Sequence, residues 1–367
     1  MTGGKVMVSI SLCMIVKNEE AVLGRCLDCV REIADEIILV DTGSSDQTKE
    51  IGARYTDKIY DYPWKDDFSA ARNFGLHEAK MDYVMWLDAD DMITPDQRGK
   101  FLQLKAALPY DRESGLPVDV VMMKYAVAFD RKGRPTFSFY RERLWRNGKG
   151  FLFEGKVHEA VQTYGNVVYE DLIVEHRKVK SRDRNRNLRI YERMRKEGKI
   201  LTPREQFYYA RELYDHQRYT DAAKAFRQFL KMPDGWAGNK ADACRFLAYC
   251  CYYMGNEAGG LQALLDGLKY GVPKAELCCD IGKHFMDRKQ WKEAAFWYRA
   301  AEELPRENTQ DCFLVGDCYG YLPCIQLSVC YDALGEREQA AYYHRKAGQW
   351  KPYGEEYLKN KPYFEFR

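Results

Sequence analysis

The chain has 367 residues, of which 46% are hydrophobic and 31% are charged. This length is sufficient for two domains with a buried core each, and the composition excludes a disordered chain. The formal net charge of +2 excludes a general attraction to nucleic acid or to an anionic membrane, so any anion site must be local.

The longest uncharged apolar stretch near the C-terminus, residues 318–331, contains Pro323 and is too short to span a bilayer. Residues 1–7 lack the apolar centre of a signal peptide, so we expect a cytoplasmic protein without a transmembrane segment. Most of the twelve cysteines lie in apolar helical surroundings after residue 240, and Cys26 and Cys29 form a lone C-x-x-C. We therefore interpret the cysteines as buried hydrophobic residues rather than as metal ligands.

The N-terminal stretch predicts two buried parallel strands joined by a helix. Residues 8–16 form an apolar run, and Asn18 is predicted to cap a helix with apolar residues at helical spacing over 22–30. A second apolar strand, residues 36–40, ends at Asp41. A strand, helix and strand in this order predict a parallel pair with a right-handed crossover.

Ligands in such sheets bind at the carboxyl ends of the strands, where Glu19, Asp41 and Asp88 all fall. The Asp41 carboxylate can accept a hydrogen bond from the imide N–H of uracil, and it can equally form a simple Asx turn. Arg72 and Asn73 are predicted to begin a helix whose first turn faces an anion.

Residues 84–87 predict another buried strand, and three carboxylates follow it at Asp88, Asp90 and Asp91. Carboxylates at the edge of a core are costly unless a cation neutralises them, so this stretch indicates a divalent metal ion that clamps a diphosphate. The alternative is that these aspartates only cap the turn before a helix that begins near Thr94.

Taken in order and spacing, residues 15–20, 40–46, 71–73 and 87–90 resemble the motifs of family 2 glycosyltransferases of the GT-A fold. The resemblance is strong over the first quarter of the chain and continues more weakly to about residue 180. It implies an inverting transferase that uses a UDP-sugar donor and a divalent cation, magnesium or manganese. One departure is Thr42, where many members carry a second aspartate.

By position, the resemblance assigns Asp90 to the metal ion, Glu19 and Asp41 to ribose and uracil, Arg72 to the base and diphosphate, and Asp88 to the ribose. The flanking residues Val16, Asn18 and Ala89 are expected at the same nucleotide site.

Further strands are predicted over residues 119–127 and 137–145, followed by a compact motif with Glu154, His158 and Glu159. An inverting transfer needs a carboxylate to take the acceptor's proton. Val-His-Glu resembles a tripeptide in a branch of the family that includes lipopolysaccharide-core and peptide glycosyltransferases. We assign Glu159 as the base and Glu154 as the alternative, whereas His158 completes the metal shell, binds the acceptor or is structural.

The chain is strongly basic from residue 177 to residue 199. A solvated linking helix over residues 181–202 is the simpler interpretation. The alternative is that Arg182 or Arg186 folds over the UDP diphosphate and stabilises the leaving group.

From residue 203 to residue 367 a helical pattern recurs that resembles tetratricopeptide repeats. We therefore predict an α/β GT-A domain over residues 1–180, with a mixed, mostly parallel, Rossmann-like sheet, followed by a linking helix and an all-α repeat domain. This arrangement resembles peptide glycosyltransferases of the sublancin S-glycosylating type, which implies a peptide or protein acceptor bound by the repeats. The repeats can instead form only a core or a homodimer surface. Two other functions stay open: transfer to a surface polysaccharide or lipid-linked saccharide, and an inactive scaffold.

Overall fold

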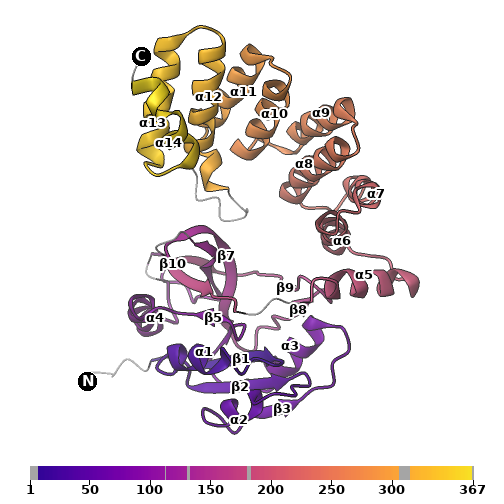
Figure 1. Cartoon of the computed structure of the whole chain (residues 1–367). Helices are drawn as coiled ribbons and strands as arrows, with labels where there is room; N and C mark the ends of the chain where they lie inside the picture. Colours follow the sequence, from indigo (N-terminus) through magenta and orange to yellow (C-terminus); the bar gives the residue numbers. More distant parts are fainter. Residues whose placement is uncertain (1–6, 112, 130–132, 180–182, 306–314, 366–367) are drawn as a thin grey trace. The chain divides into compact units, whose positions relative to one another are not determined.

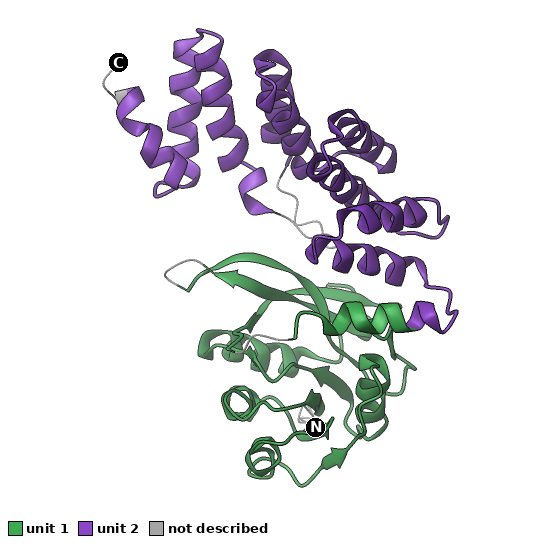
Figure 2. Cartoon of the chain, turned by 45° about the vertical axis from the view of Figure 1, so that its right-hand side comes forward, with its two compact units in different colours: residues 1–193 green, residues 194–367 purple. Residues whose placement is uncertain are grey.

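The computed structural model describes residues 7–111, 113–129, 133–179, 183–305 and 315–365. The chain divides into two compact units, Met1–Arg193 and Met194–Arg367 (Figure 2). No helix in the described ranges is both long and apolar enough to cross a membrane.

Unit 1 is an α/β unit (Figure 1). Its strands are β1 (Ile10–Val16), β2 (Glu36–Asp41), β3 (Ile59–Asp61), β4 (Tyr83–Trp86), β5 (Asp91–Met92), β6 (Val120–Phe129), β7 (Pro135–Arg146), β8 (Phe153–Glu154), β9 (Ala160–Val161) and β10 (Val167–His176). Its helices are α1 (Leu23–Val30), α2 (Thr48–Gly52), α3 (Phe68–His77) and α4 (Pro95–Ala107), and α5 (Arg186–Lys196) spans the boundary between the units.

Eight strands form one sheet in the order β3-β2-β1-β4-β7-β6-β10-β5. Strands β1 to β4 are parallel where they pair, β7 runs antiparallel to both β4 and β6, and β10 is parallel to β6. The register sets Val16 opposite Asp41 and Asp41 opposite Asp61, so the carboxyl ends of β1, β2 and β3 meet at one edge. The predicted mixed, mostly parallel sheet of GT-A type is confirmed.

The core of unit 1 is formed by the apolar strands and by one face of α1. Leu23, Cys26, Leu27 and Val30 of α1 are fully buried against the sheet in one hydrophobic cluster. Every described cysteine of the chain is buried, as the sequence predicts.

Two predicted helix starts are wrong. Asn18 does not cap α1, which begins after Val22 without a side-chain cap; Asn18 instead adopts a left-handed φ of 56° and accepts a hydrogen bond from the Ser45 amide. Helix α3 begins at Phe68, because Asp67 caps it by accepting from the Ala70 amide. Arg72 therefore lies in the second turn of α3 rather than in its first.

Unit 2 is all helical. Its elements are α6 (Pro203–Asp215), α7 (Tyr219–Leu230), α8 (Ala237–Tyr253), α9 (Glu257–Asp266), η1 (Gly267–Tyr270), α10 (Ala275–Asp287), α11 (Trp291–Glu303), η2 (Gly316–Cys318), α12 (Tyr321–Ala333), α13 (Arg337–Trp350) and α14 (Glu355–Glu365).

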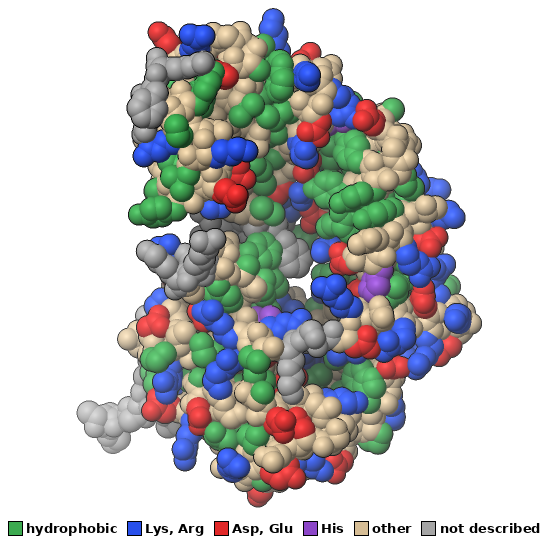
Figure 3. All heavy atoms as spheres, viewed as in Figure 1, with side chains coloured by type: hydrophobic (Ala, Val, Ile, Leu, Met, Phe, Trp, Pro, Cys, Tyr) green, Lys and Arg blue, Asp and Glu red, His purple; other side chains and the backbone are tan. Residues whose placement is uncertain are grey.

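Four helix pairs repeat one packing scheme in unit 2, as predicted for tetratricopeptide-like repeats. The second helix of each pair carries a small buried residue at the same position, namely Ala222, Gly260, Ala294 and Ala340. A Cβ atom at Gly260 would lie 2.3 Å from the Tyr252 ring, which explains why a glycine stands there. Basic and acidic side chains are interspersed on the visible face of each unit (Figure 3), in keeping with the balanced charge.

Candidate active site

The Asp41 carboxylate is fixed at the carboxyl end of β2. Its Oδ1 atom accepts hydrogen bonds from the amides of Gly43 and Ser44, both at 2.8 Å. Its Oδ2 atom is buried and has no hydrogen-bond partner among the described residues, although the residue is only 1% exposed. The Asx turn and a binding role are therefore compatible, because the turn uses one oxygen and leaves the other for a donor.

Hydrogen bonds join the loop after β1 to the segment after β2 that follows Asp41. The Asn18 amide donates to the Ser44 hydroxyl at 2.9 Å, and the Glu19 amide donates to the Thr48 hydroxyl at 2.7 Å. Val16, at the end of β1, is buried. The predicted nucleotide residues Asn18 and Glu19 thus lie on a loop that hydrogen bonds hold against the loop of Asp41, and Val16 ends the strand before that loop.

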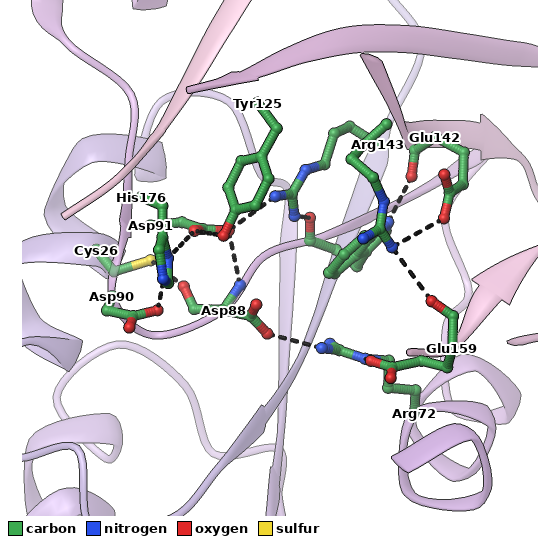
Figure 4. Close-up of polar contacts among 12 residues, drawn as sticks. Cys26, Arg72, Asp88, Asp90, Asp91, Tyr125, Glu142, Arg143, Glu159 and His176 are labelled. Carbon is green, nitrogen blue, oxygen red and sulfur yellow. Dashed lines mark hydrogen bonds and ion pairs between the residues drawn. The ribbon is translucent and has the colours of Figure 1, made fainter. Parts of the chain in front are cut away.

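Asp88 to Asp91 form a tight turn after β4. The Asp91 amide donates to the Asp88 carbonyl, and the Asp88 amide donates to Asp91 Oδ2, both at 3.0 Å. Asp91 is wholly buried and forms an ion pair of 3.1 Å with the equally buried Arg143 of β7. Tyr125 of β6 donates its hydroxyl proton to Asp91 Oδ1 at 2.9 Å (Figure 4). Ala89 is buried within the turn and contributes to the core of unit 1.

His176, the last residue of β10, completes this cluster (Figure 4). Antiparallel pairing of β10 with β5 sets His176 opposite Asp91. Its Nδ1 atom lies 3.3 Å from Asp90 Oδ1 and 3.4 Å from Asp91 Oδ1. Burial lowers the pKa of His176, but hydrogen bonds to Asp90 and Asp91 outweigh this effect and raise it to about 9.

The cluster of Asp90, Asp91 and His176 fits a divalent cation. One possible ligand atom from each of the three residues lies within 4.8 Å of the others. Carboxylate oxygens suit Mg²⁺ and Mn²⁺, and an imidazole nitrogen beside them favours Mn²⁺ over Mg²⁺. His158, the histidine expected at the metal, is not a member of this group and lies between β8 and β9 with a φ of 54°.

Sequence reasoning missed His176. The only local signal was its place at the end of an apolar stretch, residues 167–176, which has the same form as the ends of β2 and β4.

Arg72 connects two carboxylates of the site. Its Nη2 atom lies 2.7 Å from Asp88 Oδ1, and its Nε atom lies 2.7 Å from Glu159 Oε1. The remaining nitrogen, Nη1, is buried without a hydrogen-bond partner among the described residues. Burial alone would lower the pKa of Arg72, but Asp88 and Glu159 raise it above its ordinary value, so the guanidinium stays charged.

Three guanidinium groups surround the indole ring of Trp86. The Cζ atoms of Arg72, Arg141 and Arg143 lie 4.5, 4.8 and 4.0 Å from the ring centroid. Arg141 also donates to the backbone carbonyl of Glu159 at 3.3 Å. Cation–π contacts thus hold three positive charges among the carboxylates of the site.

The two carboxylates predicted as bases lie in different surroundings. The Glu159 side chain is largely buried and joined to Arg72. Glu154 is exposed on β8, where its Oε2 atom accepts a hydrogen bond of 2.8 Å from Gln162. The structure therefore brings Glu159, and not Glu154, into contact with the residues around Asp88.

The basic arm meets this cluster at its first residue, Arg177, whose amide donates to the Asp90 carbonyl at 2.9 Å. Arg186, the first residue of α5, stacks on the Phe68 ring at 4.5 Å. Arg189 and Arg193 form ion pairs with Asp183 and Asp66. Arg182 lies outside the described residues.

Comparisons with known proteins find one family model and several similar proteins. Residues 11–160 match the model of the family "Glycosyl transferase family 2". The SPbeta prophage-derived glycosyltransferase SunS of Bacillus subtilis is 28% identical over 239 residues, which cover 60% of this chain and 54% of that protein. A TPR repeat-containing protein of Synechococcus elongatus is 35% identical over 158 residues, 43% of this chain and 36% of that protein.

The lipopolysaccharide core biosynthesis glycosyltransferase LpsC of Rhizobium meliloti is 28% identical over 165 residues, 43% of this chain and 58% of that protein. The chain thus spans between about a third and three fifths of the length of these relatives. Among solved structures, glucosyl-3-phosphoglycerate synthase from Mycobacterium tuberculosis with Mg²⁺ and UDP matches at 21% identity and a TM-score of 0.27, covering 35% of this chain and 45% of that chain. The TPR protein YrrB matches at 17% identity and a TM-score of 0.37, covering 49% of this chain and 84% of that chain.

Proposed function

On the premise of a family 2 glycosyltransferase domain at residues 11–160, we propose that the chain is an inverting, metal-dependent transferase. It moves a hexose or N-acetylhexosamine from a UDP-sugar to a side chain of a peptide or protein. The observation that carries the proposal is the Oδ2 atom of Asp41, a buried acceptor without a partner among the described residues. Such an atom is costly until a donor reaches it, and the imide N–H of uracil is a donor of the right kind.

Asp90 and His176 would hold the divalent cation. The bound cation would neutralise the negative charge that develops on the departing uridine diphosphate. Arg72 supports the same side of the reaction, because its buried Nη1 atom can donate to a diphosphate oxygen while the other nitrogens hold Asp88 and Glu159.

Glu159 is the base in this proposal, and Glu154 is the alternative. The carboxylate of Glu159 takes the proton of the acceptor's hydroxyl or thiol as that atom attacks the sugar carbon from the face opposite UDP. Arg72 and Arg141 hold Glu159 through its side chain and its backbone, so the carboxylate keeps one position. Glu154 shares none of these contacts and is bonded to Gln162.

A peptide or protein acceptor is supported by the helical repeats of unit 2, a class of fold that commonly binds peptides along one face. A second candidate is transfer to a cell-surface or lipid-linked saccharide, which the relative named for lipopolysaccharide core biosynthesis favours. Labelled UDP-glucose and UDP-N-acetylglucosamine added to a cell extract with the protein separate the two: label in polypeptide supports the first, and label in saccharide alone supports the second.

Nucleotide binding tests the observation that carries the proposal. Asp41→Ala should weaken UDP binding about 10- to 100-fold, since a hydrogen bond to a charged group contributes roughly 1.5–3 kcal/mol. Asp61→Asn is the matched control, because Asp61 is opposite Asp41 on β3 but is exposed and paired with Lys49. The wild type should prefer UDP to CDP. Equal binding of the two nucleotides, or a loss in Asp61→Asn as large as in Asp41→Ala, contradicts the proposed base contact.

Metal dependence and activity are measured by UDP release from UDP-sugars with Mn²⁺ present. Release by the wild type that disappears in Asp90→Ala excludes the inactive scaffold. Absence of release with every donor and acceptor extract supports the scaffold instead.

A further inference from the structure

We infer that Asp91 is not a metal ligand but a positioning residue, which together with Tyr125 and Arg143 holds His176 and the turn of Asp90 for the cation. This inference rests on the cation of the proposed function. Asp90, Asp91 and His176 each have a possible ligand atom. The inference assigns Asp90 and His176 as the metal ligands and Asp91 as the residue that supports them.

Both oxygens of Asp91 are already occupied (Figure 4). Oδ1 accepts from the Tyr125 hydroxyl at 2.9 Å and lies 3.4 Å from His176 Nδ1. Oδ2 accepts from the Asp88 amide at 3.0 Å and lies 3.1 Å from Arg143 Nη2. Each oxygen thus accepts one hydrogen bond and has one further polar or charged neighbour, so an ion at Asp91 would compete with four groups that are already in place.

A cation at Asp91 would also have to displace Arg143. The guanidinium of Arg143 is wholly buried between two aromatic rings, 4.0 Å from the Trp86 centroid and 4.3 Å from the Tyr125 centroid. Its Nη1 atom donates to the Trp86 carbonyl at 3.2 Å. Because the charge of Asp91 is already balanced by this fixed cation, Asp91 exerts little attraction on a second one.

Asp90 is placed differently. Its carbonyl accepts a hydrogen bond of 2.9 Å from the Arg177 amide, which ties the turn to the end of β10 directly beside His176. The side chains of Asp90 and His176 both keep some exposure, 8% and 17%, whereas Asp91 has none. Asp90 and His176 are therefore the pair that an ion can reach, and Asp91 lies against the imidazole ring of His176, with its Oδ1 atom 3.4 Å from Nδ1.

Tyr125→Phe is the sharpest test, because it removes one hydroxyl from Asp91 and leaves every charged group in place. The matched control is Tyr140→Phe: Tyr140 lies on the neighbouring strand, next to the register partner of Tyr125, and its hydroxyl makes no hydrogen bond with a described residue. Mn²⁺ binding to the full chain is measured by calorimetry, with and without UDP, together with the melting temperature of each variant.

We expect Tyr125→Phe to weaken Mn²⁺ binding about 10-fold, as for other groups that orient a metal ligand, while Tyr140→Phe binds as the wild type does. Asp90→Asn and His176→Gln should lose at least about 100-fold. Electron paramagnetic resonance of bound Mn²⁺ should show coupling to an imidazole nitrogen that is lost in His176→Gln and weakened in Tyr125→Phe, a change that a purely structural role would not produce.

The inference is overturned if Tyr125→Phe binds Mn²⁺ within two-fold of the wild type with unchanged nitrogen coupling. It is also overturned if folded Asp91→Asn loses Mn²⁺ binding as completely as Asp90→Asn while Tyr125→Phe does not, because Asp91 would then be a ligand. A wild type that binds no Mn²⁺, with or without UDP, removes the metal from the proposed function itself, which distinguishes the two failures.

Discussion

Replacing Arg143 by methionine tests the electrostatic support of the site. Arg143 and Asp91 are both wholly buried and 3.1 Å apart, so the substitution leaves a carboxylate without its cation in the core of unit 1. Breaking a buried ion pair from one side costs about 3–5 kcal/mol. In a unit of this size each kcal/mol lowers the melting temperature by about 2–4 °C, so we expect a decrease of roughly 10 °C.

Calorimetry of the full chain measures this decrease, and two further variants make the result specific. Arg146→Met is the control, because Arg146 ends the same strand and forms no side-chain ion pair with a described residue; it should change stability by less than about 0.5 kcal/mol. Arg143→Met combined with Asp91→Asn removes both charges and should be more stable than Arg143→Met alone. A melting temperature of Arg143→Met within 2 °C of the wild type, or a double variant less stable than the single one, would refute the reasoning.

Three other outcomes follow from single contacts. Phe226→Ala removes a fully buried ring from unit 2 and should cost about 3–5 kcal/mol, seen as an earlier thermal transition of that unit. Thr202→Ala removes the capping box of α6 and should cost about 1 kcal/mol in the same experiment. Arg72→Lys replaces a guanidinium that contacts both Asp88 and Glu159 by a single ammonium, so sugar transfer should fall by about 10-fold or more. The melting temperature should also fall, because one of the two carboxylates loses its ion pair.

Half of the strands described in unit 1 could be predicted because their signal is local. The apolar runs at residues 8–16, 36–40 and 84–87 are too short and too β-branched or aromatic for helices, and they became β1, β2 and β4. Helix starts were harder to predict, since several residues near a boundary can cap. The sequence predicts Asn18 as the cap of α1, but the Asn18 side chain links two loops. Asp67 is the cap of α3, and it places Arg72 in the second turn of that helix.

Some residues of the site can likewise be predicted from the local sequence, whereas others depend on contacts between segments that are distant in the sequence. Asp41 and Asp90 could be proposed from the sequence because Asp41 ends one buried strand and Asp90 follows another, where a ligand is expected in such a sheet. His176 could not, because it is 85 residues from Asp91 and reaches it only through the pairing of β10 with β5. No pattern in the sequence fixes that pairing, which depends on how β6, β7 and β10 extend the sheet.

The carboxylates at this edge of the sheet differ in the positively charged group that each of them contacts. Asp88 and Glu159 share Arg72, and Asp91 has Arg143, so each of these three carboxylates has a guanidinium partner within the fold. Asp90 faces a histidine, a weaker and reversible source of positive charge. In the proposed function, a divalent ion is therefore not needed to pair these three carboxylates, and it would bind at a site that their contacts have already ordered.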